Sequence, residues 1–229
     1  MIRRLTRFST MCLGILVLGL VLTPKAAEAQ FGVRGGVSLS SLFGGDVTQA
    51  DTRQGLTGGF STTLFSVGPV SVGPELHYVQ KGSALTQLNP EAMESFQEFG
   101  LDYVEVPVML RLGIPLPFGD DGIRGYAEGG PAFAWRVNCT ITPEAGGVAL
   151  SDECAFAQFQ DAESVVESAD RGAVVGGGLV VELPVVGGFV TLDGRLVRGL
   201  TRLEAGEDGL QVRNRALSLT LGYDIGAFR

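Results

Sequence analysis

Few residues in this 229-residue chain could do chemistry, and histidine is the scarcest of them. Only one histidine, His77, occurs, and it stands two positions after Glu75. A multi-histidine metal site and an HExxH metalloprotease motif are therefore excluded, and the GxSxG and GxGxxG motifs are absent. A histidine beside a carboxylate can act as a general base, or it can be a histidine hydrogen-bonded to neighbouring charges. We favour the second interpretation and expect no catalytic residue, no metal site and no cofactor.

The first 29 residues have the layout of a secretory signal peptide. Three arginines among the first seven residues form a basic start, an apolar run extends from Cys12 to Leu22, and Ala27-Glu28-Ala29 fits the small-x-small cleavage rule. The run is shorter than the ~20 apolar residues that a membrane anchor needs. We predict a signal peptide over 1–29 and a single mature domain over 30–229. Cleavage would remove four basic residues and one acidic residue, which changes the net charge from −8 to −11.

Eight strand-like runs follow, each long enough to cross a membrane when tilted, which takes ~9–11 residues. The connections alternate between long polar segments and shorter segments rich in Pro and Gly. Long loops on one side, short turns on the other and an even strand number are typical of an up-and-down barrel in an outer membrane. The predicted strands are Phe31–Ser40, Gly55–Ser66, Val70–Lys81, Leu101–Gly113, Ile123–Val137, Gly172–Leu183, Gly188–Leu200 and Asn214–Ala227; the long connections are 41–54, 82–100, 138–171 and 201–213.

Residue types alternate along these runs with the period of two that a strand requires. In the fourth run every second residue from Val104 to Leu112 is aliphatic, and the residues between include Glu105 and Arg111. A soluble barrel would place the aliphatic face inside and a membrane barrel would place it outside, so the pattern alone leaves both open. The loop alternation, the signal peptide and aromatic residues near both ends of the runs favour the membrane barrel. These aromatic residues are Phe31, Phe65, Phe118, Phe189 and Tyr223 at one end and Tyr78, Tyr103 and Trp135 at the other.

We therefore predict an all-β fold, a single eight-stranded antiparallel up-and-down transmembrane β-barrel. The interior of such a barrel is just wide enough for side chains to fill it. Charges of both signs on the predicted inner face indicate a salt-bridge network that plugs the lumen, because unpaired buried charges are costly. The alternative is a narrow cation-preferring pore, since the predicted acids outnumber the arginines six to three. The predicted lumen network is Glu75, His77, Glu105, Arg111, Arg124, Glu128, Glu182, Asp193, Arg195 and Asp224.

Two cysteines of the mature chain, Cys139 and Cys154, lie in the longest predicted connection. An even pair in an exported protein predicts a disulfide. A metal pair is the alternative, and it is disfavoured because no histidine lies nearby. The same connection is rich in acidic residues, which keep a loop solvated. They lack the regular spacing of a calcium-binding loop.

Four stretches resemble a known family: Phe31-Gly32-Val33-Arg34-Gly35-Gly36, Pro74-Glu75-Leu76-His77-Tyr78-Val79-Gln80-Lys81-Gly82, Leu101-Asp102-Tyr103-Val104-Glu105-Val106-Pro107 and Tyr126-Ala127-Glu128-Gly129-Gly130-Pro131. Together they look like the outer-membrane β-barrel family labelled porin-family or PorT-like, which resembles the small eight-stranded OmpX/OmpA-type barrels. The resemblance covers nearly the whole mature chain. It implies this fold and an outer-membrane location in a Gram-negative-type bacterium. It implies no defined activity, although one branch of the family is similar to a component of a secretion apparatus.

The expected role is structural or recognition-related. The expected partners are outer-membrane lipids and an extracellular or envelope protein that contacts the loops 82–100 and 138–171. The acidic mature chain argues against nucleic acid, and against anionic lipid headgroups as main partners. Two other functions stay open at this point: a narrow channel, and a lipid-modifying enzyme that uses His77 near the outer rim.

Overall fold

The predicted barrel is confirmed by a computed structural model, which describes residues 30–45, 47–88, 95–116, 122–143, 150–151, 167–185, 187–202 and 211–226. The predicted signal peptide and Cys154 lie outside these residues. Among the described residues, no helix is long and apolar enough to cross a membrane. The strands are β1 (Gln30–Gly44), β2 (Val47–Thr63), β3 (Phe65–Val67), β4 (Val70–Leu88), β5 (Ser95–Ile114), β6 (Ile123–Pro143), β7 (Leu150–Ser151), β8 (Ala169–Glu182), β9 (Phe189–Gly199) and β10 (Val212–Ile225).

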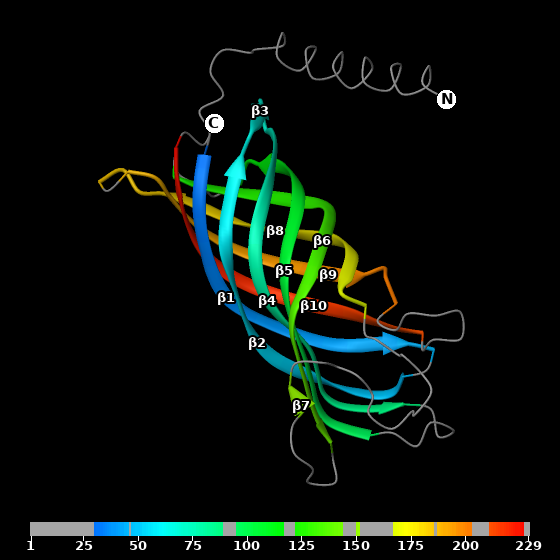
Figure 1. Cartoon of the computed structure of the whole chain (residues 1–229). Coiled ribbons are helices and arrows are strands. Elements are labelled where there is room, and N and C mark those ends of the chain that lie inside the picture. The colour runs from blue at the N-terminus through cyan, green and yellow to red at the C-terminus, as the bar shows by residue number, and fades with distance from the viewer. Residues whose placement is uncertain are drawn as a thin grey trace, which may run out of the picture.

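The sheet closes on itself because its first and last strands pair with each other (Figure 1). β1 pairs antiparallel with β10 from Phe31↔Ile225 to Gly44↔Val212, and each strand in between pairs with the strand before it and the strand after it. β3 follows β2 after Leu64 and pairs with the same neighbour, β4, while β7 is a two-residue strand on β6. Eight strand positions therefore form the wall, and closure leaves its ring without an open edge.

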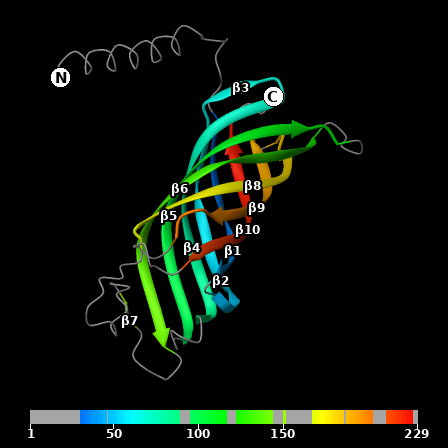
Figure 2. The ribbon, with the colours of Figure 1, turned by 90° about the vertical axis from the view of Figure 1, so that its right-hand side faces the viewer.

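The strands reach further at one end of the barrel than the sequence predicts. The segment 41–54, predicted as a long connection, is largely strand, because β1 runs to Gly44 and β2 starts at Val47. β4 likewise runs to Leu88 and β5 starts at Ser95. The sequence of these extensions lacks the regular aliphatic alternation that marks a wall strand, while the backbone pairing continues. Figure 2 shows β5 and β6 passing beyond β8 and β9 at the end where β7 lies.

The aliphatic face of the wall points outward. Leu110 and Leu219 are each 54% exposed and Leu221 is 61% exposed, whereas Glu75 is 3% exposed and Asp193 1%. A soluble barrel would show the reverse, so the wall is built to contact an apolar phase. This settles the choice that the alternating pattern left open.

Two of the aromatic residues predicted for the outer girdles point inward instead. Phe189 is buried with Tyr126 and Val180 near the end of the barrel that holds the chain's first strand residue. Tyr103 is fully buried near the opposite end, in a cluster with Leu101 and Phe99. Both lie at the strand parity of the inner face, so position along the strand alone misplaced them. Phe31, Phe65, Tyr78 and Trp135 are exposed on the outside, as predicted.

Candidate functional site

The candidate site is an ionic layer inside the barrel, centred on Glu75. The Glu75 side chain has no exposed surface. Its Oε1 accepts a hydrogen bond from Arg111, its Oε2 accepts one from Arg195, and its Oε2 also lies 2.8 Å from Nε2 of His77. These residues come from β4, β5 and β9, and alternation along each strand places them on the inner face. One carboxylate therefore ties three parts of the wall together.

Glu128 on β6 completes a closed ring of alternating charges. Its Oε2 accepts a hydrogen bond from Nε of Arg111 at 3.0 Å, and its Oε1 lies 2.6 Å from Nε of Arg195. The sequence of contacts is thus Glu75, Arg111, Glu128, Arg195 and back to Glu75. Each charge in the ring faces two of opposite sign, which is the condition under which buried charges are tolerated.

A second group of residues extends the layer across the lumen to β1 and β10. Asp193 lies 2.5 Å from Nε of Arg195 and accepts a hydrogen bond at 2.6 Å from the hydroxyl of Tyr126. Arg34 on β1 lies 3.7 Å from Asp193 and 3.9 Å from Asp224 on β10. The layer therefore joins seven of the eight wall positions, since Ser61 on β2 also donates a hydrogen bond to Asp224, at 3.2 Å.

Glycines on the neighbouring strands make room for these large side chains. A Cβ at Gly222 would lie 2.9 Å from Cγ of Arg34, and a Cβ at Gly176 would lie 3.0 Å from Cγ of Arg195. β8, which brings no charge into the layer, contributes Gly176 and Gly178. In each case the glycine stands directly opposite the charged residue in the strand register; the pairs are Gly32↔Asp224, Gly222↔Arg34, Gly176↔Arg195 and Gly178↔Asp193.

Further from the barrel end that holds Gln30, a second ion pair joins β4 to β5. Lys81 donates a hydrogen bond to Glu105, and its ammonium lies 5.2 Å from the centre of the Tyr103 ring. The Tyr103 hydroxyl accepts a hydrogen bond at 3.2 Å from Nδ2 of Asn214. This pair lies between the ionic layer and the apolar cluster that contains Leu101 and Phe99. The interior therefore alternates between apolar and ionic levels along the barrel axis.

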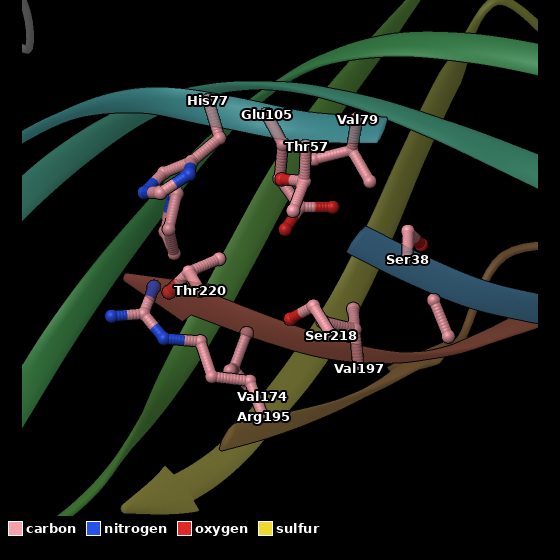
Figure 3. Close-up of a pocket in the computed structure, with 12 residues that line it drawn as sticks. Ser38, Thr57, His77, Val79, Glu105, Val174, Arg195, Val197, Ser218 and Thr220 are labelled. Atoms are coloured by element: carbon pink, nitrogen blue, oxygen red, sulfur yellow. The ribbon is translucent and has the colours of Figure 1, made fainter. Parts of the chain in front are cut away.

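A small cavity lies between the two ionic levels. His77 and Glu105 line one side of it, and Arg195, Ser218 and Thr220 line the other (Figure 3). The space open to the centres of water molecules is about 20 Å³, and one water needs roughly 10–15 Å³. The cavity thus holds about one or two waters and is too small for an organic ligand.

Eight of the ten residues predicted for the lumen network are buried inside the barrel. The other two lie at its end: Glu182 is exposed at the last residue of β8, and the half-buried Arg124 places its guanidinium 5.9 Å from the centre of the Phe189 ring. The sequence analysis missed two cations of the network, Arg34 and Lys81. Both lie at the inner parity of their strands, so a stricter count of alternating positions would have found them.

The charge balance of the network changes with these assignments. The side chains joined by the described contacts are four cations and five carboxylates: Arg34, Lys81, Arg111 and Arg195, with Glu75, Glu105, Glu128, Asp193 and Asp224. The buried Asp170 on β8, which interacts electrostatically with Lys81 and Glu105, adds a sixth carboxylate, so the predicted acid excess of six to three becomes six to four. Within the described part of the chain, no group of three or more His, Cys, Asp or Glu residues is arranged to hold a metal ion.

The predicted disulfide concerns a residue at the outer end of β6. Cys139 is buried beside Leu101 and Tyr103. Its predicted partner, Cys154, lies outside the described residues, so the pairing stays a prediction.

Comparison with known proteins gives the barrel a family. Residues 23–204, well over half of the chain, match the family described as outer membrane protein beta-barrel domain. The chain belongs to this family. It is therefore an outer-membrane protein of the Gram-negative type, as the resemblance implied, and its aliphatic wall faces the lipid of that membrane. No curated protein matches the chain.

Several solved outer-membrane structures are similar to the chain at very low identity. OprG, an outer membrane protein from Pseudomonas aeruginosa, is 10% identical, with 87% of this chain and 97% of that chain covered and a TM-score of 0.51. Ail, the attachment invasion locus protein of Yersinia pestis, is 11% identical over 86% of this chain and 99% of that chain, with a TM-score of 0.41. The outer membrane protease OmpT from Escherichia coli is 9% identical over 90% and 99%, with a TM-score of 0.46. The likeness to OprG shows the fold alone and leaves the activity open.

Proposed function

We propose that this protein is a non-conducting outer-membrane barrel that acts through its extracellular segments, with a lumen closed by its own side chains. The observation that carries the proposal is the closed Glu75–Arg111–Glu128–Arg195 ring, which crosses the lumen at its ionic layer. Loops on a rigid barrel are where recognition can reside. The segments 82–100 and 138–171 are our candidates for contact with an extracellular or envelope protein.

Closure is supported by what lies on both sides of the ring. Toward the end where β1 starts, the inner face carries the apolar cluster Tyr126, Val180 and Phe189. Toward the other end lies the cluster around Leu101 and Tyr103. A permeating ion keeps its hydration only along a continuous water path, because a bare charge in an apolar medium costs many kcal/mol. The cavity between the ionic levels has room for about one or two waters, which supports a closed lumen.

The arrangement of His77 supports a non-catalytic role. Its ring is buried at 5% exposure, its Nε2 is 2.8 Å from Glu75, and its register neighbour on β5 is Glu105. A base that acts on membrane lipid must reach the lipid, whereas this ring lies inside the wall. The four buried cations, which pair with five of the lumen carboxylates, likewise weaken the case for a cation-preferring pore.

Conductance of the folded mature protein in a planar lipid bilayer tests closure. Insertion is first verified by heat-modifiable migration on a gel. We expect a silent membrane after verified insertion. Reproducible stepwise openings that change with Glu105→Gln or Arg111→Gln would overturn the closed-lumen proposal and favour the channel.

Recognition by the extracellular segments is tested by shortening residues 144–149 and 152–166 to brief Gly-Ser linkers. Heat-modifiable migration shows whether the barrel persists. Surface cross-linking on intact cells should then lose the adducts that the full-length protein forms. Unchanged adducts from both proteins would contradict a recognition role for 138–171. The same replacement of 89–94 serves as the matched test of the other segment.

A further inference from the structure

Four arginines gather on the outward face of β8, β9 and β10, at the end of the barrel away from the chain's first strand residue. Arg171, Arg198 and Arg215 are exposed and Arg213 is half-buried. Arg198 and Arg215 stand directly opposite each other in the β9–β10 register. Arg171 is two residues from Ala173, the register partner of Arg198, so it is a diagonal neighbour. We call Arg171, Arg198, Arg213 and Arg215 the arginine patch.

The patch lies where the lipid-facing wall ends. The next outward positions toward the membrane are Leu196 and Leu217, 46% and 51% exposed. On the adjoining strand β6, Phe133 is the register partner of Arg171, and it is 43% exposed. Exposed aromatic rings at this level mark the membrane–water interface of a barrel. Charged side chains here therefore meet lipid headgroups.

The direct opposition of Arg198 and Arg215 is unfavourable by itself. Like charges directly opposite on neighbouring strands destabilise a sheet. The described residues on the outward face of β1, β8, β9 and β10 beyond Leu196 and Leu217 include no Asp or Glu that would compensate them. An anion seated between the two guanidinium groups turns this repulsion into two charge-assisted contacts.

Two of the arginines are also held in position by neighbours on β1. Arg198 places its guanidinium 5.2 Å from the centre of the Phe43 ring, and Nε of Arg215 donates a 2.7 Å hydrogen bond to Oγ of Ser41. Both side chains are thus oriented along the wall before any ligand arrives. The remaining guanidinium donors of each stay free to form a fork around an oxyanion.

We propose that the arginine patch binds the phosphate groups of phosphorylated outer-leaflet lipids. A phosphate oxyanion bridges Arg198 and Arg215, and Arg171 and Arg213 add positive charge on either side. The acyl chains of the same lipid lie along Leu196 and Leu217, so one lipid molecule contacts both the arginine patch and the aliphatic wall. This local binding surface departs from the expectation that the acidic chain avoids anionic headgroups. Net charge describes the whole molecule, whereas exposed charges interact over about 8–10 Å at physiological ionic strength.

The test is binding of diphosphoryl lipid A to the full mature protein folded in zwitterionic detergent, measured by native mass spectrometry. Trp135, the chain's single tryptophan, lies on β6 beside the patch and reports binding through its fluorescence. We expect R198Q/R215Q to weaken binding tenfold or more, because each arginine near an anionic surface contributes roughly fivefold. The charge-preserving R198K/R215K should lose less.

The control Arg53→Gln removes one arginine charge from β2, which lies on the other side of β1 from the patch, and should stay within about twofold of wild type. Dephosphorylated lipid A should bind wild type and R198Q/R215Q equally weakly. Equal affinity of wild type for both lipids, or an unchanged affinity in R198Q/R215Q, would overturn the proposal. If inorganic phosphate bound to the protein and diphosphoryl lipid A did not, the assignment to a lipid would be overturned.

The stability of the variant gives a readout that does not depend on lipid binding. Without phosphorylated lipid, R198Q/R215Q relieves the repulsion and should unfold at the same or a higher urea concentration than wild type. With diphosphoryl lipid A the order should reverse, because only wild type gains binding free energy. A variant that is less stable under both conditions would contradict the repulsion on which the proposal depends.

Discussion

Glu75 accepts hydrogen bonds from two arginines and lies against a histidine, and its side chain has no exposed surface. We expect Glu75→Gln to lower the free energy of unfolding by about 3–5 kcal/mol, because removing one partner leaves buried charge uncompensated. Urea unfolding of the protein in lipid vesicles measures the change.

Asp224→Asn provides the matched control for this prediction. Asp224 pairs with Arg34 at 3.9 Å and accepts a hydrogen bond from Ser61, so it takes part in fewer and longer contacts. The two substitutions remove one negative charge each. Equal costs for both would contradict the central place that we assign to Glu75.

Gly222 tests the room that glycines leave for the ionic layer. A Cβ at Gly222 would lie 2.5 Å from Oγ1 of Thr191 and 2.9 Å from Cγ of Arg34. Gly222→Ala should therefore cost about 1–3 kcal/mol of unfolding free energy, the usual cost of overpacking. At Gly35 a Cβ meets no atom within 4 Å, so Gly35→Ala should be neutral or slightly stabilising. Similar costs for the two alanines, measured in urea, would show that steric room is not what Gly222 provides.

Most residues of the ionic layer could be predicted from the alternation of residue types within single strands. Glu75, Arg111, Glu128 and Arg195 all follow from parity once the polar face is known to point inward. Their pairing was not predictable, because the partners of Glu75 lie on β5 and β9 and are brought to it by barrel closure and register. Arg34 was overlooked among the glycines around it in the sequence. Of these, Gly32 provides space for Asp224, while Gly222 on β10 provides space for the stem of Arg34.

At the level of the strand, membrane depth controls what the wall tolerates. Leu219 is 54% exposed in the middle of β10, and Leu200, just after β9, is 55% exposed at the rim beside the arginine patch. Leu219→Arg should cost about 2–4 kcal/mol and Leu200→Arg about 0–1 kcal/mol, because the penalty for arginine falls from midplane to interface. Urea unfolding in vesicles measures both costs. A larger penalty at Leu200 would show that Leu200 lies deeper in the membrane than Leu219, and that the arginine patch is not at the membrane–water interface.

The strands also show where sequence patterns lose information. The wall portions of β4 and β5 were predicted because lipid on one side and a charged lumen on the other enforce a period of two. Past the membrane, no lipid phase selects one face, so the continuation to Leu88 and from Ser95 lacks aliphatic alternation and looked like a loop. Backbone pairing alone sustains strands there.

At the scale of the whole molecule, the ionic layer and the two apolar clusters act as one plug through the barrel. The eight-strand wall fixes the lumen width, and the width makes long side chains from opposite walls meet. Removing charge without removing volume would leave the lumen filled. A test of closure must therefore shorten side chains in the ionic layer while keeping the charge of the layer constant.

R111A/E128A meets this requirement, because it deletes one cation and one anion of the ring and leaves Glu75 paired with Arg195. We expect stepwise conductance from R111A/E128A in planar bilayers where wild type is silent, since the vacated volume admits water between the apolar clusters. V108A/L110A shortens two side chains on the lipid-facing side of the same strand and should stay silent. If folded R111A/E128A is as silent as V108A/L110A, the apolar clusters close the barrel without the ring, and the ring's role is to hold the strands together.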